Sequence, residues 1–154
     1  GARVTHVKPH GALHNVACAD VAVATTVVHA LHQLDAQLPL LAPPYSQLAA
    51  VAEQMGHPVR YEVFADRAYL DDGQLVPRAQ KGAVLHDTAE CVTHVMRMLQ
   101  AQGIVTATGK VLPCRIDSIC VHGDGAQAVQ TARAVRDALQ ASGYAVVPLD
   151  ECKA

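Results

Sequence analysis

Three short stretches of this sequence group ionisable side chains at spacings that suit acid–base chemistry. They read KPHG (8–11), EVFADR (62–67) and VHGDG (121–125). In a strand, side chains two residues apart share a face. Even-numbered positions in each stretch, counted along the strand and just beyond its end, hold the ionisable pairs. These pairs are Lys8 and His10, Glu62 and Asp66, and His122 and Asp124. Each stretch therefore ends a strand-like segment with titratable groups on one face.

Several strands that end in such groups are the expected construction of an active site in an α/β protein. In parallel sheets and barrels, sites assemble at the carboxyl ends of the strands. Lysine and glutamate are rarely buried alone, so Lys8 and Glu62 are expected to pair with each other or with a ligand. The predicted catalytic residues are Lys8, His10, Glu62, Asp66, His122 and Asp124.

Each of these residues also has a plainer interpretation. Lys8 suits a solvated strand end, and His10 before Gly11 suits a turn. Glu62 suits an edge strand, and Asp124 suits the cap of the last helix. These interpretations stay open, because the strand register is itself inferred from the pattern.

A long polar loop, roughly 65–86, follows the second stretch. Loops of this length in a compact domain are usually functional or disordered. Arg67 and Arg78 in this loop could clamp a carboxylate or a phosphate. The alternative is a surface lid with ordinary charges, in which Asp71-Asp72-Gly73 forms a turn.

Helical and strand patterns alternate along the chain, which predicts a parallel sheet with flanking helices. The expected strands are 3–8, 59–64, 118–121 and 146–147, with a hairpin over 104–113, and residues 39–42 form a short apolar run that ends at Pro43-Pro44. The expected helices start at Asp20, Ser46, Asp87 and Gly125. We expect one α/β domain over residues 1–154.

The composition excludes several classes of protein. The chain has 154 residues, a net charge of −2 and no apolar run of membrane-spanning length, so neither nucleic acid nor a membrane is expected as a partner. Its five cysteines form no C-x-x-C pair, which argues against a disulfide framework or a structural zinc site and favours the cytoplasm. His29 and His32 lie three apart on a predicted helix and are expected on its solvated face rather than on a metal.

The motifs VKPHGALHN, EVFADRAYLDDGQLVPR and ICVHGD, in this order, resemble the family of 5-oxoprolinase A subunits, also called LamB/YcsF. The resemblance implies an irregular (β/α) barrel similar to the glycoside hydrolase/deacetylase superfold. It also implies ATP-dependent opening of 5-oxo-L-proline (pyroglutamate), a small-molecule substrate, to L-glutamate. Partner subunits B and C would take part in that reaction.

The resemblance and the chemistry together suggest roles for the matched residues. Glu62 or Asp124 would be the base for water, and His122 or His10 the acid for the leaving nitrogen. Lys8 would stabilise the oxyanion. The expected substrate-binding residues are Arg67, Arg78 and Asn15. ATP is expected as a co-substrate, with Mg held through partner subunits, and neither a tightly bound cofactor nor a metal of this chain is expected.

Two departures from the family pattern shape the remaining expectations. His14 stands where members commonly have Tyr, and the upstream DLNCDLGE-like and GFHAGDP-like motifs do not occur in this sequence. The chain thus resembles the C-terminal part of a member, a partial barrel without its first strands. Such a barrel would expose strand edges, so we expect self-association, pairing with a separately encoded N-terminal piece, or little activity.

Two other functions fit the same residues. One is a metal-dependent hydrolase of the deacetylase type, with His10, Glu62, His122 and Asp124 as ligands. The other is a non-catalytic assembly module that keeps the fold without the chemistry. Metal analysis of the purified chain would separate the first of these from a lactam hydrolase.

Overall fold

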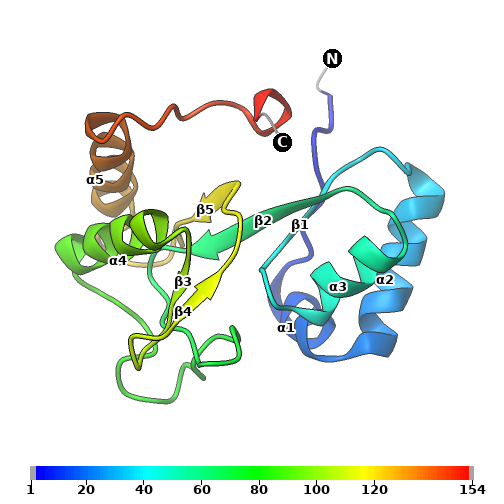
Figure 1. The fold of residues 1–154 in the computed structure, drawn as a ribbon, viewed down its shortest axis with the longest axis horizontal. Helices are drawn as coiled ribbons and strands as arrows, with labels where there is room; N and C mark the ends of the chain where they lie inside the picture. Colours follow the sequence, from blue (N-terminus) through cyan, green and yellow to red (C-terminus); the bar gives the residue numbers. More distant parts are fainter. Residues whose placement is uncertain (1–2, 153–154) are drawn as a thin grey trace. The chain divides into compact units, whose positions relative to one another are not determined.

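The protein is described here by a computed structural model that covers residues 3–152. These residues form two compact units, the first ending at Glu62 and the second beginning at Val63. Figure 1 labels their helices and strands. Strand β2 (Val59–Phe64) runs through the boundary, and its two halves belong to different hydrophobic cores.

In the first unit, short parallel strands pack with three helices. Strand β1 (Leu40–Ala42) pairs in parallel with the first half of β2, from Leu40 opposite Val59 to Ala42 opposite Tyr61. The helices are α1 (Gly11–Ala19), α2 (Val21–Leu34) and α3 (Gln47–Gln54). They pack against one another, as Figure 1 shows. Their apolar faces and β1 enclose the core of this unit.

Two predicted helix starts in the first unit are confirmed. The Asp20 carboxylate accepts hydrogen bonds from the first amides of α2, at 2.8 Å from Ala22 N and 3.1 Å from Val23 N. The Ser46 hydroxyl caps α3 by accepting a bond from Ala49 N at 3.1 Å. Such caps satisfy amides that have no partner within the helix. The sequence pattern therefore located both helices at their first turn.

The start of the chain differs from the prediction. The expected strand at 3–8 is wrong, because only Val7 forms a bridge, in parallel with Leu40. The chain turns at Gly11, whose φ of +60° lies in the left-handed region that glycine adopts without strain. Helix α1 then begins where a turn was expected. Its buried side chains are His14, Ala17 and Cys18.

In the second unit, two helices pack on each other beside the second half of β2 and the strand β5 (Ser118–Cys120). The helices are α4 (Thr88–Ala101) and α5 (Ala128–Ala141), seen side by side in Figure 1. Asp87 caps α4, as predicted, through bonds from Ala89 N at 2.8 Å and Glu90 N at 3.0 Å.

The hairpin predicted over 104–113 is confirmed. Strands β3 (Gly103–Val105) and β4 (Val111–Pro113) are antiparallel, with Ile104 opposite Leu112. Ile104 and Leu112 are buried in the core that also holds Val63 and Phe64. This hairpin helps to bury the end of β2, which forms the first half of the ionisable stretch at 62–67.

Three details of the second unit correct the sequence prediction. Strand β5 is half-buried rather than buried, and α5 begins at Ala128 rather than Gly125, with Gln127 as its N-cap residue. Asp124 is therefore not the cap of that helix. The expected strand at 146–147 does not form, and the chain runs on to a 3₁₀ turn at Leu149–Glu151. In the described residues nothing pairs with this last segment as a strand.

The predicted face of each helix is right in outline and wrong at some positions. On α2, Val21, Ala24, Val28 and Leu31 follow the spacing that predicts a buried face; Ala24, Val28 and Leu31 are buried, whereas Val21 is exposed. On α4, the apolar spacing of Val92, Val95, Met96 and Leu99 predicts a buried face, but Val95 is buried with Cys91 and Met98, whereas Val92, Met96 and Leu99 are only half-buried. The actual face is thus rotated slightly from the one inferred from the apolar residues alone.

The α/β class with parallel strands and flanking helices is confirmed. Within residues 3–152, no single helix has the length and apolarity to cross a bilayer, and α1 and α2 reach that criterion only as a pair bent by 116°.

Candidate functional site

In the first unit, Lys8 and Glu62 form an ion pair, and the other predicted site residues of this unit are described relative to it. Lys8 Nζ contacts Glu62 Oε1, and the Glu62 side chain is only 9% exposed against 27% for Lys8. Each charge compensates the other for the loss of water, which a lone buried charge could not tolerate. The expectation that these two residues pair is therefore confirmed, although the strand assigned to Lys8 is absent.

His14 lies close to this pair, on the buried face of α1. Its Nε2 is 3.6 Å from the Cys18 sulfur. Burial lowers the pKa of His14, and the Lys8 charge lowers it further, against an opposing effect of Glu62. The imidazole is therefore held in its neutral form beside a fixed pair of charges. Burial also raises the pKa of Cys18 to about 11, so this sulfur remains a thiol at neutral pH.

His10 and Asn15 occupy more open positions in the same unit. His10 is exposed and precedes α1 without capping it through its side chain. Asn15 is exposed on the helix itself. Both side chains are accessible to a ligand, and their predicted roles in catalysis and substrate binding stay predictions.

In the second unit, Asp66 and His122 form a hydrogen-bonded pair. The Nδ1–H of His122 donates to both carboxylate oxygens of Asp66, at 2.8 and 2.7 Å. The imidazole also stacks on Phe64, with ring centroids 5.6 Å apart and planes 9° from parallel. A carboxylate on Nδ1 selects the tautomer and leaves Nε2 to exchange protons. The fold brings these two residues together from positions 56 apart in the sequence.

This pair forms part of the wall of a polar cavity of about 370 Å³. Arg78 and Asp124, both exposed, line the same cavity. His86 lines it as well, so the cavity joins two imidazoles, two carboxylates and a guanidinium. It offers one cation for an anionic group and two kinds of proton carrier, which is the chemistry expected of a hydrolytic site.

Cys91 also borders the cavity but does not supply a nucleophile. Burial and the nearby carboxylates, Asp66 foremost among them, raise the pKa of its thiol to about 11. A thiol is a poor nucleophile compared with its thiolate. Among the residues that line this cavity, oxygen and nitrogen groups therefore carry the chemistry.

Arg67, a predicted substrate-binding residue, bonds to the backbone of its own loop. Its side chain is 6% exposed, and its guanidinium donates to two loop carbonyls, from Nε to Ala83 O at 3.2 Å and from a terminal nitrogen to Val76 O at 2.7 Å. Burial, and then the neighbouring Arg78, lower its pKa. Arg67 ties together the loop that carries Arg78, and its direct contact with substrate stays a prediction.

The loop over 65–86 is ordered by further bonds of this kind. Tyr69 is fully buried, and its hydroxyl accepts a bond from Phe64 N at 2.8 Å. Asp71 accepts bonds from Thr106 and Thr108 of the β3–β4 turn, at 2.6 and 2.7 Å. The loop is thus bound to the core at several points, and it forms a fixed wall for the cavity.

The four ligands considered for a metal site lie in different units, His10 and Glu62 in the first and His122 and Asp124 in the second. Over residues 3–152, no three His, Cys, Asp or Glu side chains converge in a way that would hold a metal ion. His32 lies half-buried against His57 rather than on a solvated face, with Nδ1 atoms 3.3 Å apart.

Comparison with known proteins identifies the family. The model of the LamB/YcsF family matches residues 1–154. The chain belongs to this family. The family assignment made from the three motifs is therefore confirmed over the full sequence.

Similar curated proteins are named as the A subunit of 5-oxoprolinase. The protein of Azoarcus sp. (strain BH72) is 52% identical over 151 residues, which covers 98% of this chain and 59% of that protein. The protein of Nitrobacter winogradskyi is 48% identical over 153 residues, with 99% of this chain and 60% of that protein covered. The chain thus spans about three fifths of the length of these LamB/YcsF relatives.

A solved structure supports the same fold. The crystal structure of a lactam utilization protein from Thermus thermophilus superposes with a TM-score of 0.82 at 37% identity. The match covers 92% of this chain and 56% of the Thermus protein. This chain and the Thermus protein therefore share the arrangement of helices and strands described above.

Two residues of these clusters were not predicted from the sequence. Phe64 has the parity of Glu62 and Asp66, so its position beside His122 could have been anticipated from the same alternation. His14 shares the helical spacing of Ala17 and Cys18, which marks a buried face. That signal was hidden because helix α1 itself was not predicted.

Proposed function

We propose that this LamB/YcsF protein is a component of a 5-oxoprolinase that hydrolyses 5-oxo-L-proline to L-glutamate in an ATP-dependent reaction. The observation that carries the proposal is the Asp66–His122 pair in a cavity that also presents Arg78 and Asp124. The names of the similar Azoarcus and Nitrobacter proteins support the choice of reaction.

The reaction requires two proton transfers at a lactam. A water oxygen attacks the carbonyl carbon while a base takes its proton, and the ring C–N bond then breaks as the nitrogen accepts a proton from an acid. The products are a new carboxylate and an amino group on one open chain. An acid–base pair positioned for such transfers contributes roughly 10²–10⁴-fold to the rate.

His122 is the proposed acid for the leaving nitrogen. Because Asp66 occupies its Nδ1–H, the proton that it delivers comes from Nε2. The stacked ring of Phe64 keeps the imidazole in one plane. This arrangement places the donor atom without the loss of orientation that a free surface histidine would have.

Asp124 is the proposed base for water. It lines the same cavity as His122, whereas the other candidate, Glu62, is engaged by Lys8. Arg78 is the proposed partner of the substrate carboxylate, since it is the cavity's guanidinium and suits a planar anion. Stabilisation of the oxyanion by Lys8, a residue of the first unit, stays a prediction.

A lactam is stabilised by resonance, and transfer of a phosphoryl group from ATP to its oxygen, with release of ADP, would make the carbon more reactive. After water attacks and the ring C–N bond breaks, hydrolysis of the resulting acyl phosphate by a second water would release inorganic phosphate and leave the carboxylate. We propose that this activation requires partner subunits, in keeping with the names of the relatives, which describe one component of a larger enzyme. The expected partners are subunits B and C, with Mg and the nucleotide held by them.

The test is glutamate formation from 5-oxo-L-proline by this chain with the partner subunits, and in parallel at the aligned positions of the Azoarcus relative. His122→Asn retains a donor toward Asp66 but removes the proton carrier, and should lower kcat by roughly 10²–10⁴-fold. His29→Asn, on the exposed side of α2, is the matched control. Wild-type kcat in His122→Asn and in Asp124→Asn would refute the proposal.

A further inference from the structure

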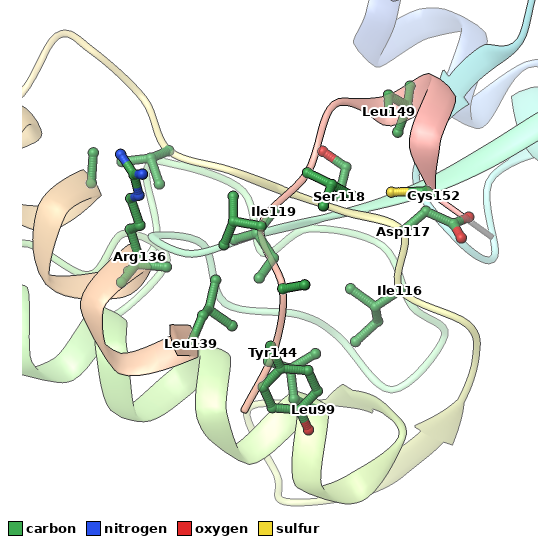
Figure 2. Close-up of a pocket in the computed structure, with 16 residues that line it drawn as sticks. Leu99, Ile116, Asp117, Ser118, Ile119, Arg136, Leu139, Tyr144, Leu149 and Cys152 are labelled. Carbon is green, nitrogen blue, oxygen red and sulfur yellow. The ribbon is translucent and has the colours of Figure 1, made fainter. Parts of the chain in front are cut away.

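Helix α5 carries a hydroxyl on a face that is otherwise apolar. Thr131, Val135 and Leu139 follow one another at intervals of four residues, and Thr131 and Val135 are buried, at 6% and 4% exposure. Farther along the helix this face lines an aliphatic cavity of about 500 Å³, in which Figure 2 shows Leu139, Ile119 and Leu99. A buried hydroxyl needs a hydrogen-bond partner, because burial without one is unfavourable.

The partner of Thr131 is a second hydroxyl, on the first turn of α4. Thr131 Oγ1 and Thr88 Oγ1 lie 2.9 Å apart, and the Thr88 hydroxyl donates to Gln127 Oε1 at 3.2 Å. A hydroxyl has one proton to donate. Because Thr88 gives its proton to Gln127, Thr131 is the donor in the bond between the two hydroxyls. The chain of bonds therefore has one direction, from Thr131 through Thr88 to the amide of Gln127.

The direction of this chain sets the orientation of the Gln127 amide. The amide oxygen accepts from Thr88, so the NH₂ group with its two protons is the part that remains for a ligand. Gln127 is the N-cap residue of α5 and lines the polar cavity together with Asp124 and His122. Its backbone carbonyl also accepts from Thr131 N at 2.8 Å. The cavity thus has a neutral donor whose side chain and backbone are both held.

The reaction proposed above forms a negatively charged oxygen that suits such a donor. When the second water attacks the acyl phosphate, its oxygen bonds to the carbonyl carbon, a base takes its proton, and the carbonyl π electrons move to the carbonyl oxygen. The oxyanion then collapses, the C–O bond to the phosphoryl group breaks, and phosphate leaves with the electrons of that bond. Preorganised N–H donors, including glutamine side chains, stabilise oxyanions of this kind in acyl transfer.

We infer that Gln127 is the oxyanion donor for hydrolysis of the acyl phosphate, and that Thr88 and Thr131 position its amide. The inference rests on the proposed function. It gives one cavity an acid for the nitrogen, His122, a base for water, Asp124, and a donor for the oxygen. All of these side chains belong to the second unit.

Loss of the donor should also change how ATP is used. Ring opening leaves the acyl phosphate and the new amino group on one chain, at the distance that forms a five-membered ring. An acyl phosphate that persists long enough to leave the site therefore closes again, because its own amine attacks the carbonyl carbon and expels phosphate. ATP is then consumed without formation of glutamate. A slower second step should lower the amount of glutamate formed per ADP.

The test measures glutamate and ADP formed from 5-oxo-L-proline and ATP by this chain with the partner subunits. Gln127→Glu keeps an oxygen for Thr88 but replaces the NH₂ donor by an acceptor. It should lower kcat for glutamate by roughly 10²–10³-fold and lower the ratio of glutamate to ADP. Gln130→Glu, which adds the same charge at an exposed position of α5, is the matched control and should behave as the wild type does.

Thr88→Val tests the positioning role, because it removes the hydroxyl that orients the amide and leaves Gln127 in place. The ratio of glutamate to ADP should fall, by less than in Gln127→Glu, while the KM for 5-oxo-L-proline stays the same. Thr88→Ser restores the hydroxyl and should restore the ratio. A purely structural role would instead lower the midpoint of thermal unfolding and leave the ratio unchanged, which would contradict positioning by Thr88.

A wild-type kcat and ratio in Gln127→Glu would overturn the inference. If His122→Asn is impaired in the same assay, the proposed function stands and only the role of Gln127 is wrong. If the wild-type chain with its partners forms no glutamate at all, the proposed function fails and the inference fails with it.

Discussion

The two units each hold one acid–base pair, and the pairs differ in what they can do. Lys8 and Glu62 join a cation to a buried carboxylate and sit beside neutral His14. Asp66 and His122 join a carboxylate to an imidazole on the wall of an open cavity. Lysine and glutamate ordinarily keep their charges throughout the neutral range, whereas histidine is the side chain whose ordinary charge change falls at about pH 5 to 8.

The difference separates a group that supplies charge from one that transfers protons. A compensated pair of fixed charges contributes a constant field and holds neighbouring backbone in place. An imidazole with one nitrogen held by a carboxylate can accept and release a proton at the other. The following changes test this division of labour, from the largest expected effect to the smallest.

The proton-transfer role of the second pair is tested most directly by a substitution of Asp66. Asp66→Asn replaces a carboxylate that accepts from Nδ1–H of His122 by an amide that can also face it with a donor. We expect kcat for glutamate formation to fall by roughly 10²–10⁴-fold, as for the loss of an orienting carboxylate in other acid–base sites. Asp137→Asn, on the exposed side of α5, is the control. Retention of wild-type kcat would remove Asp66 from the mechanism.

The fixed pair is expected to affect stability more than turnover. Lys8→Met leaves the Glu62 carboxylate buried without its cation. We expect the free energy of unfolding to fall by about 2 kcal/mol, less than the roughly 3–5 kcal/mol of a fully buried pair because Lys8 is partly exposed. Denaturant titration measures this change.

A double-variant cycle sharpens that prediction. Lys8→Met combined with Glu62→Gln removes both charges, and the double variant should be more stable than Lys8→Met alone. Additive losses from the two single variants would mean that the residues do not interact in solution. The contrast with the Asp66–His122 pair would then lose its basis.

The packing around the Asp66–His122 pair can be weakened by a substitution outside the pair. Tyr69→Phe removes the hydroxyl that accepts from Phe64 N, and Phe64 stacks on His122. A buried amide left without its partner costs about 1–3 kcal/mol. We expect a loss in that range by thermal or denaturant unfolding, with a smaller decrease in kcat. A decrease in kcat without any loss of stability would contradict this account of the packing.

Acid should destabilise the chain through histidines that neither pair uses. Burial lowers the pKa of His57, and it likewise lowers that of His94. Below about pH 6.5 these two histidines are therefore more protonated in the unfolded chain than in the folded one. The free energy of unfolding consequently falls as the pH falls. Each histidine that is protonated only in the unfolded chain lowers the free energy of unfolding by at most about 1.4 kcal/mol per pH unit.

Replacement of His57 isolates its share of this dependence. His57 donates from Nε2 to Leu38 O at 2.9 Å, and its Nδ1 faces that of His32, with Asp35 nearby. His57→Gln should flatten the fall in stability between about pH 7.5 and about pH 5.5, measured by urea titration at each pH. An unchanged slope would show that His57 titrates equally in both states.

Helix starts and strand parity were the parts of the fold that the sequence revealed best. Asp20, Ser46 and Asp87 act through bonds to amides two or three residues away, so the signal is local. Parity placed Asp66 and His122 on strand ends that meet. Lys8 pairs with Glu62 because buried charges need partners, although the strand expected for Lys8 does not form.

Long-range contacts decided what the sequence could not reveal. Val146 and Val147 are β-branched residues of the kind that favours strands, but a strand exists only where another strand pairs with it. Residues 3–8 show the same dependence, since Val7 alone meets Leu40. Nothing in the sequence indicated that the guanidinium of Arg67 bonds the carbonyls of Val76 and Ala83, because only the folded loop brings these groups together.

The tie formed by Arg67 also limits how this family can vary. The loop tip at 72–73 follows Asp71, which is bonded to Thr106 and Thr108, and lies inside the ring that Arg67 closes, so insertions at 72–73 can lengthen the loop while Arg78 keeps its place. Lysine at position 67 could not reach two carbonyls with a planar fork. Relatives with new substrate preferences should therefore differ at the tip and keep arginine at the base, and a loop transplanted between members should carry its own Arg67.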